Sequence, residues 1–472
     1  MLFTSNVFVQ YFLPLLLVLY FIPKLGIKGK NLVLLIFSLI FYAFGGVRHF
    51  FLLLLSILIN YFGGIGVGLC GSKRNKKLVL WISVIGNLSM IGVFKYAGFA
   101  TSILKDLGLL TEIVEIALPI GISFFTFQGL SYVIDVYRED TPVQKNPLNV
   151  ALYVSLFPQL VAGPIVRYTD VEKEIVHRNH SVSAVSDGLV RFMLGFGKKM
   201  LIANAMGQVA DEVFALINTD LLTTPLAWVG ALAYTMQIYF DFSAYSDMAI
   251  GLGKIFGFHF NENFNYPYIA SSVTDFWRRW HISLSTWFRD YVYIPLGGNR
   301  CSKVRHIFNL ATVWLLTGLW HGASWNFIAW GAYYGLLLIL EKFVLHKLLP
   351  KIPKWIRHMS TLFIVVIGWV FFRATTLNDG VEYISVMFGS GSLDLSSTVY
   401  YLLQFAPEFV CAIIGIFPLK KLIVDIFEKH EEKKGVLVLR EVLSKAFAVI
   451  VFILSYTALV SGSFNPFIYF QF

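Results

Sequence analysis

The chain has 472 residues, of which 57% are hydrophobic and only 14% are charged. A typical soluble domain carries about 25% charged residues, so this composition excludes a soluble globular enzyme and indicates a multi-span membrane protein. The net charge of +10 is no evidence for nucleic-acid binding, because the basic residues lie in short segments between apolar runs, as the positive-inside rule predicts. The three cysteines lie far apart and match no metal or redox spacing.

The apolar runs predict an all-α polytopic membrane protein with a single membrane domain over residues 1–472. Several runs are shorter than the roughly 20 residues that a helix needs to cross a bilayer, so we expect some helices to be tilted or re-entrant. No basic region precedes the first run, so we expect a retained span and not a signal peptide. The expected spans are residues 7–23, 31–44, 50–70, 78–94, 117–134, 148–165, 189–217, 225–257, 307–320, 323–341, 359–375, 400–418 and 446–462.

The segments between these spans predict an orientation. With the N-terminus outside, the outer segments 45–49, 95–116, 376–399 and 463–472 contain very few lysines and arginines. Most of these residues then fall on the cytoplasmic side, as the positive-inside rule requires. The basic inner segments are residues 24–30, 71–77, 298–306, 342–358 and 419–445.

A polar stripe interrupts the expected span 225–257. Gln237, Asp241 and Tyr245 are spaced four residues apart and therefore share one helix face, while Asp247 lies on another. Intramembrane carboxylates mark cavities or buried pairs. Two roles are open for Asp241, orienting an imidazole or pairing with Arg278 or Arg279, and we favour the pairing.

His281 belongs to a stretch in which tryptophan and arginine alternate. Ser272 and Asp275 have the spacing of a capping box, so we expect a helix to begin there. The helix would have an aromatic face and a polar face, as helices that lie at a membrane interface do. The histidine is then either part of an anchoring helix or functional, and the arginines suit either phosphate or lipid headgroups. The two faces are Trp277, Trp280, Leu284, Trp287 and Arg278, His281, Ser285, Arg289.

His321 follows an apolar run of about 13 residues, Ile307–Leu319. A helix of that length reaches only about 20 Å, so we expect this histidine to lie within the depth of the membrane. Gly318 and Gly322 flank it and leave room for the backbone or for a ligand. The alternatives are a buried histidine that bonds a carbonyl and a reacting group.

Familiar catalytic motifs are absent from the chain: it has no G-x-S-x-G, Walker A or H-E-x-x-H sequence. A histidine without an evident nucleophile favours general-base chemistry on a hydroxyl group, in a membrane enzyme that transfers an acyl or other group. Two rivals remain. A transporter would use Asp241 and Asp247 as a proton relay, and a scaffold would only recruit an extracellular enzyme.

Four stretches resemble the signature of the membrane-bound O-acyltransferase (MBOAT) superfamily, and in particular its bacterial branch of alginate O-acetyltransferase membrane subunits. The resemblance covers about residues 1–345, with its signature region at 234–345, and it extends to LPIGISFFTFQGLSYVIDVYR, FPQLVAGPIVRY and SNVFVQYFLP. The four stretches are YFDFSAYSDMAIGLG, ENFNYPYI, DFWRRWHISLSTWFRDYVYIPLGGNR and GLWHGASWNF.

The resemblance implies a ring of tilted transmembrane helices, with interfacial and re-entrant helices, around a central tunnel. It makes His321 the catalytic base and His281 a second catalytic position, with Arg278 and Arg279 toward the donor. Polar residues that line the tunnel or support it would be Asp241, Tyr245, Trp320 and Asn326.

The resemblance also implies the reaction. The protein would take an acetyl group from acetyl-CoA or another cytoplasmic donor, without a bound cofactor or metal. It would deliver that group to an extracytoplasmic polysaccharide, through a partner acetyltransferase of the SGNH-hydrolase type, from the bacterial inner membrane. D-alanyl transfer and peptidoglycan O-acetylation are alternatives. D-alanyl exporters have a longer insert where this chain reads YIPLGGNR, which favours O-acetylation.

Overall fold

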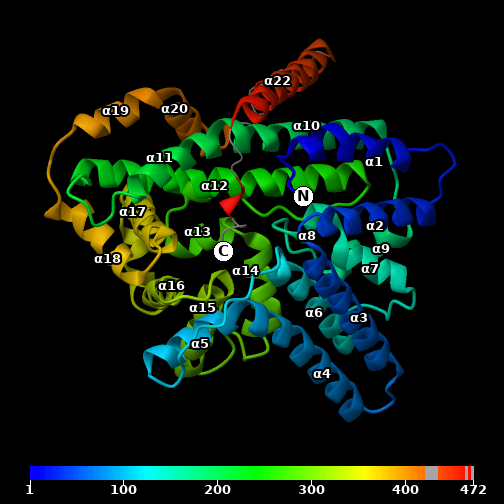
Figure 1. Cartoon of the computed structure of the whole chain (residues 1–472). Helices are drawn as coiled ribbons and strands as arrows, with labels where there is room; N and C mark the ends of the chain where they lie inside the picture. The colour runs from blue at the N-terminus through cyan, green and yellow to red at the C-terminus, as the bar shows by residue number, and fades with distance from the viewer. Residues whose placement is uncertain (420–433, 463–465, 469–472) are drawn as a thin grey trace. The chain divides into compact units, whose positions relative to one another are not determined.

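The computed structural model describes residues 1–419, 434–462 and 466–468, and these form helices and connecting segments (Figure 1). The chain packs into two compact units: unit 1 is Met1–Phe192 with Tyr245–Asn261, and unit 2 is Met193–Ala244 with Glu262–Phe472. Two helices belong in part to each unit, α10 (Val182–Gly197) and α12 (Thr224–Ile255). The expected all-α polytopic class is confirmed, while the ring, the tunnel and the single domain remain predictions.

Unit 1 contains the first part of the chain. In it α3 packs along α4 and α6. A π-helical turn, Phe8–Phe12, precedes α1, and another, Gly92–Tyr96, joins α4 to α5. Its helices are α1 (Leu13–Tyr20), α2 (Ile27–Ala43), α3 (Val47–Leu69), α4 (Lys73–Ile91), α5 (Ala97–Asp106), α6 (Ile122–Arg138), α7 (Pro147–Ser155), α8 (Phe157–Leu160) and α9 (Tyr168–Val176).

Unit 2 contains the residues that were singled out for chemistry from the sequence, except Tyr245 and Asp247, which lie in unit 1. Here α15 and α16 run side by side (Figure 1), and the fully buried Trp330, Tyr334 and Trp369 lie in the core. Its helices are α11 (Asn204–Phe214), α13 (Val273–Arg279), α14 (Ile282–Phe288), α15 (Lys303–His321), α16 (Trp325–Phe343), α17 (Lys354–Arg373), α18 (Leu377–Ser385), α19 (Ser396–Gln404), α20 (Ala406–Gly415) and α22 (Lys434–Ser461).

Fewer helices than expected are long and apolar enough to cross a membrane on their own. Among the described residues there are 4, at Val47–Leu69, Lys73–Asp106, Lys354–Arg373 and Val438–Ser461. Two bent pairs raise the number to 6: α16 with residues 345–351, bent by 55°, and α19 with α20, bent by 70°. Most other expected spans form shorter or less apolar helices, which agrees with the expectation of tilted or re-entrant segments.

Several expected boundaries are wrong. The run 148–165 is not one span, because Leu156 leaves the helical conformation between α7 and the four-residue α8. The outer segment 95–116 is helical as far as Asp106, because α4 continues through the π-helical turn into α5. Residues 420–433 of the basic segment 419–445, and residues 463–465 and 469–472 of the outer segment 463–472, lie outside the described residues.

Candidate functional site

The helix that carries His321 is longer than predicted. Ser302 caps α15, since its hydroxyl accepts a hydrogen bond from the backbone N of Arg305 at 3.4 Å, and the helix runs for 19 residues from Lys303 to His321. At 1.5 Å per residue this is roughly 28 Å, close to the thickness of a bilayer core. The helix is therefore long enough to cross a bilayer core, contrary to the expectation from its apolar run, and the depth of His321 in the membrane remains a prediction.

The glycines beside His321 allow the backbone of α16 and the ring of Phe327 to pack closely against α15. A Cβ atom on Gly318 would lie 3.2 Å from the Cα atom of Gly331 in α16, and one on Gly331 would lie 2.5 Å from the carbonyl oxygen of Trp314. The backbones of α15 and α16 therefore touch where these glycines meet. A Cβ atom on Gly322 would fall within the ring of Phe327. This close packing fixes the end of α15 that presents His321.

Aromatic rings enclose the imidazole of His321, whose residue is only 6% exposed. The ring centroids of Trp320, Trp330 and Phe372 lie 5.0, 5.1 and 5.1 Å from its own. α15, α16 and α17 contribute one ring each. The histidine thus lies in an apolar pocket built from three helices, which strengthens every electrostatic interaction that it makes there.

His281 does not lie on a continuous amphipathic helix, so that prediction is wrong. Ser272 does cap a helix as expected, accepting a hydrogen bond from the backbone N of Asp275 at 3.0 Å, but α13 ends at Arg279. Trp280 is extended, and His281 has a left-handed backbone with φ 45° before α14 begins at Ile282. The aromatic face that we assigned to a membrane interface is buried in the unit, with Trp280 packed 4.8 Å from Trp369.

The break turns His281 into the interior, where it is 1% exposed. Its Nδ1 lies 3.2 Å from Oδ1 of Asn263, which also accepts hydrogen bonds from the backbone N and the hydroxyl of Ser283. The ring of Phe242 packs edge-on at 4.6 Å. Burial lowers the pKa of His281 to about 3, so this imidazole is neutral at physiological pH.

The two histidines share one neighbour. The indole of Trp320 lies 5.9 Å from the ring of His281 and 5.0 Å from the ring of His321, measured between centroids. The two imidazoles are therefore no farther apart than the sum of these distances. We predicted two layers, one at the inner face and one deeper. The structure shows that both histidines contact a single tryptophan, and their depths in the membrane remain a prediction.

The two arginines predicted to face the donor differ from each other. Arg279 is held in place, since its Nε donates to Asp275 Oδ1 at 2.8 Å and its Nη1 donates to the carbonyl oxygen of Asn265 at 3.2 Å. Arg278 is exposed and lies close enough to the exposed Lys342 for their charges to repel. Of the two, Arg278 is the one open to an anionic ligand.

Asp241 is paired as predicted, but its partner is not an arginine. Its Oδ1 accepts a hydrogen bond from Lys199 Nζ at 2.6 Å, and its Oδ2 accepts one from the backbone N of Ile468 at 2.8 Å. Lys199 also donates to the carbonyl oxygen of Pro466 at 3.1 Å. Lys199 was not predicted from the sequence. A lysine inside the apolar run 189–217 was the signal that could have identified it.

The remaining predicted polar residues have packing roles. Tyr245 belongs to unit 1, where its ring stacks on Phe3 at 4.7 Å. Asn326, at the start of α16, contacts the hydroxyl of Ser324 and donates to the carbonyl oxygen of Ala374 at 2.8 Å, which ties α16 to the end of α17. Three or more His, Cys, Asp or Glu side chains arranged for a metal ion are not found in the part of the chain that the structure describes.

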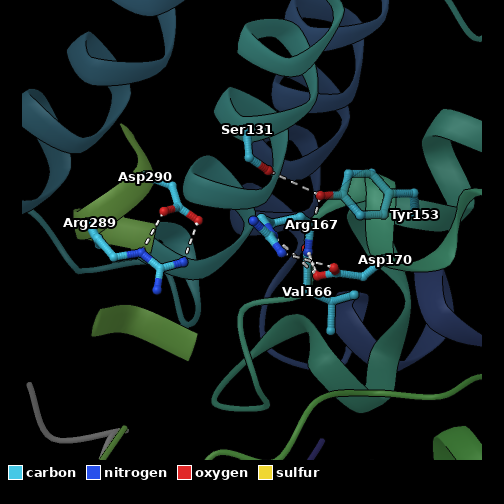
Figure 2. Close-up of polar contacts among 7 residues, drawn as sticks. All are labelled: Ser131, Tyr153, Val166, Arg167, Asp170, Arg289 and Asp290. Atoms are coloured by element: carbon cyan, nitrogen blue, oxygen red, sulfur yellow. Dashed lines mark hydrogen bonds and ion pairs between the residues drawn. The ribbon is translucent and has the colours of Figure 1, made fainter. Parts of the chain in front are cut away.

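Further polar contacts involve three of the stretches that carry the resemblance (Figure 2). In unit 1 the hydroxyl of Tyr153 donates to the carbonyl oxygen of Val166 at 3.0 Å and lies 3.3 Å from the hydroxyl of Ser131. Arg167 pairs with Asp170 at 3.2 Å at the start of α9. In unit 2 Arg289 pairs with the adjacent Asp290 at 2.7 Å. These contacts stabilise the local fold, and none of them involves a histidine that we predicted to react.

Comparison with known proteins places these features in a family. The family model described as MBOAT, membrane-bound O-acyltransferase family, matches residues 139–378, a range that includes both histidines. The probable alginate O-acetylase AlgI of Azotobacter vinelandii is 40% identical over 100% of both chains. The peptidoglycan O-acetyltransferase of Helicobacter pylori is 36% identical over 84% of this chain and 81% of its own.

A more distant relative has a different acyl group in its name. The teichoic acid D-alanyltransferase of Bacillus subtilis is 31% identical over 53% of this chain and 66% of its own. Acyl transfer is common to all three names, and the family model covers the helices that enclose the histidines. The chain therefore belongs to the membrane-bound O-acyltransferase family and is a multi-pass membrane acyltransferase.

Proposed function

We propose that this protein takes an acetyl group from a cytoplasmic thioester donor, acetyl-CoA or another acyl carrier, and passes it across the bacterial inner membrane for O-acetylation of an extracytoplasmic polysaccharide. The observation that carries the proposal is that two buried histidines both contact Trp320. Both lie in the range that the family model matches.

His321 is the base in this proposal. Its imidazole takes the proton of the accepting hydroxyl as the oxygen attacks the carbonyl carbon of the acetyl thioester. A C–O bond forms, the C–S bond breaks, and the departing thiolate takes a proton. A positioned base of this kind contributes about 10²–10⁴-fold to the rate. The surrounding rings of Trp320, Trp330 and Phe372 favour transfer over hydrolysis, because they exclude water.

His281 supports the reaction as a neutral group. Burial holds its pKa far below physiological pH, so it adds no positive charge beside His321, which must accept a proton. Asn263 fixes the orientation of its ring through the contact at Nδ1. We therefore assign His281 to the positioning of substrate or of Trp320, and we expect its replacement to reduce transfer less than replacement of His321.

The donor is proposed to approach Arg278. This guanidinium and Lys342 form an exposed pair of like charges, which suits the phosphate groups of a nucleotide-containing thioester. The charge bias of the connecting segments supports a cytoplasmic position for this surface. Lipid headgroups have the same chemistry, so Arg278→Gln should raise the KM for acetyl-CoA if the surface binds donor.

The acceptor is proposed to be a polysaccharide, reached through an SGNH-type acetyltransferase. A relative that matches over both full lengths bears the name of an alginate O-acetylase, and the D-alanyltransferase of Bacillus subtilis matches only about half of this chain. This favours acetyl over D-alanyl transfer. A transporter would need Asp241 and Asp247 as a proton relay. Ion pairs of Asp241 with Lys199, and of Asp247 with Arg191 at 2.8 Å, disfavour that role.

The test is transfer of labelled acetyl from acetyl-CoA, supplied at the cytoplasmic face of vesicles that contain the protein, its partner enzyme and polysaccharide. His321→Ala should lower transfer by about 10²-fold or more. The exposed His346 provides the matched control, and His346→Ala should leave transfer unchanged. Wild-type transfer by correctly folded His321→Ala protein would refute its role as base. Flux of polysaccharide without acetylation would refute the acyltransferase proposal.

A further inference from the structure

Three basic side chains in unit 1, none of which takes part in the proposed reaction, gather around Tyr20. We define this basic cluster as Lys30, Arg178 and His180. Lys30 Nζ lies 5.1 Å from the centroid of the Tyr20 ring, and Nε2 of His180 lies 2.8 Å from its hydroxyl. Arg178 donates to the same hydroxyl from Nε at 3.1 Å and from Nη2 at 3.0 Å.

Arg178 is buried, its hydrogen bonds in the described part of the chain go only to neutral oxygens, and its guanidinium lies 4.5 Å from the centroid of the Phe258 ring. The residue is 5% exposed. Besides Tyr20, its guanidinium donates to the carbonyl oxygen of Phe256 at 2.9 Å, to Oδ1 of Asn31 at 2.6 Å and to the carbonyl oxygen of Glu174 at 3.1 Å. These bonds hold the guanidinium rigidly, but none of them neutralises its charge.

The carboxylate that could balance this charge is occupied elsewhere. Glu174 offers Arg178 its backbone carbonyl, while its side chain binds His259, with Oε1 2.6 Å from Nδ1 of that histidine. The charges that act on the other two members are positive. The pKa of Lys30 is lowered by burial and by Arg178, and the pKa of His180 is lowered by burial, by Lys30 and by Arg178. The three side chains therefore have no ion-pair partner among the described residues.

An unbalanced buried cation is costly, and proteins keep one where an anion completes the site. Arginine and lysine together are the usual ligands of phosphate, arginine through its planar fork and lysine as a mobile point charge. Lys30 and His180 are only partly buried, so they face the side from which an anion would enter. Arg178, fully buried behind them, supplies fixed positive potential.

The neighbouring surface is apolar. Exposed side chains of Tyr11, Leu15, Val18 and Ile22 recur at helical spacing along α1 and the residues around it, and they lead to the end of α1 where Lys30 lies over Tyr20 and Phe21. A membrane lipid needs this combination, with an apolar face for its acyl chains and basic groups for its phosphate. Residues 24–30 also form one of the segments expected on the cytoplasmic side.

We propose that Lys30, Arg178 and His180 form a binding site for a phosphate ester, built from residues that take no part in the proposed acyl transfer. The adjacent apolar face favours the phosphodiester of a membrane lipid over the phosphates of a soluble nucleotide. In the bound state the phosphate oxygens accept hydrogen bonds from Lys30 and His180 and balance the charge of Arg178. The bound ligand would then link Lys30, near the start of α2, to His180, in the segment after α9, beside the end of α1.

The experiment measures binding to delipidated, detergent-solubilised full-length protein by native mass spectrometry. The probes are phosphatidylglycerol, diacylglycerol, coenzyme A and inorganic phosphate. Wild-type protein should bind phosphatidylglycerol and not the phosphate-free diacylglycerol. Lys30→Gln should weaken binding by about tenfold or more, because a charge-assisted hydrogen bond is lost. Lys30→Arg should retain it. Lys28→Gln is the matched control, because it removes an exposed charge from the same helix.

Each outcome decides the proposal. Binding of coenzyme A or inorganic phosphate that depends on Lys30, without binding of phosphatidylglycerol, would support the phosphate site and assign it a soluble ligand. Equal weakening by Lys28→Gln and Lys30→Gln would overturn it, as would equal binding of diacylglycerol. Should Lys30→Gln not fold, His180→Gln provides the same comparison. Binding is measured without acyl transfer, so failure here leaves the proposed function untouched.

Discussion

The two units of the chain bury positive charge in opposite ways. In unit 2 Lys199 meets the carboxylate of Asp241 at 2.6 Å, and both side chains are almost fully buried. In unit 1 the described contacts of Arg178 are to a hydroxyl group, an amide oxygen and backbone carbonyls. The first arrangement is complete without a ligand and the second is not. We therefore interpret a buried charge that has an ion-pair partner as structural. We interpret a buried charge that has none as part of a ligand-binding site.

The balanced pair should give the largest effect when it is broken. Asp241→Ala leaves Lys199 buried without its carboxylate, so we expect a loss of about 3–5 kcal/mol in the free energy of unfolding. The backbone N of Ile468 also loses its acceptor. Denaturant titration of the purified protein measures this change, and Lys199→Met combined with Asp241→Leu should recover most of it.

An exposed ion pair is the control for that measurement. Lys254 and Asp187 lie 2.7 Å apart, but their side chains are 36% and 56% exposed. Lys254→Ala should change the free energy of unfolding by no more than about 1 kcal/mol, because water screens such pairs. A cost for Asp241→Ala as small as that for Lys254→Ala would show that the buried pair is not a structural element.

Removal of the unbalanced cation should have an intermediate effect. Arg178→Gln deprives the oxygens of Tyr20, Asn31 and Phe256 of donors, at a cost of about 1–3 kcal/mol in the free energy of unfolding. It also removes an uncompensated charge, so its cost should stay below that of Asp241→Ala. Phosphatidylglycerol should stabilise the wild type but not this variant in the same titration. Equal stabilisation of both proteins would contradict the contrast between the two regions.

Two sites in unit 2 show which features can be predicted from the sequence and which cannot. The pairing of Asp241 was predictable, because a carboxylate in an apolar helix needs a partner, but its identity was not, because Lys199 lies 42 positions away. The alternation of tryptophan and arginine around His281 fits an unbroken helix as well as it fits the two short helices, α13 and α14, that the structure contains. Only the packing of Trp280 against Trp369, together with the bond to Asn263, shows why the chain turns at this point.

The helix that ends at His321 was also predicted only in part. Its apolar run begins at Ile307, but the cap at Ser302 lets the helix start within the basic segment 298–306. Hydropathy therefore underestimated its length. The space beside Gly318 and Gly322 was correctly predicted from the lack of side chains. That the backbone of α16 and the ring of Phe327 fill it depends on contacts that no local pattern encodes.

The smallest predicted effect concerns the pH dependence of unit 2. Burial holds the pKa of His281 near 3, below its ordinary value of 6.5. Between these values the unfolded chain binds a proton at this position and the folded chain does not, so stability falls as the pH falls below 6.5. The loss is on the order of 1 kcal/mol per pH unit. His281→Gln should remove this contribution, so that the variant loses less stability than the wild type between pH 7 and pH 5.5.

His346→Gln is the control, since this histidine is exposed. Denaturant titrations at the two pH values measure both variants against the wild type. If His281→Gln keeps the full wild-type dependence, then His281 accepts a proton in the folded protein. Its surroundings would in that case include a compensating charge, and His281 would be a second balanced site in unit 2, like Lys199 with Asp241. Loss of the dependence would instead support a neutral His281 beside Trp320, which leaves His321 as the group of the two that accepts the proton in the proposed transfer.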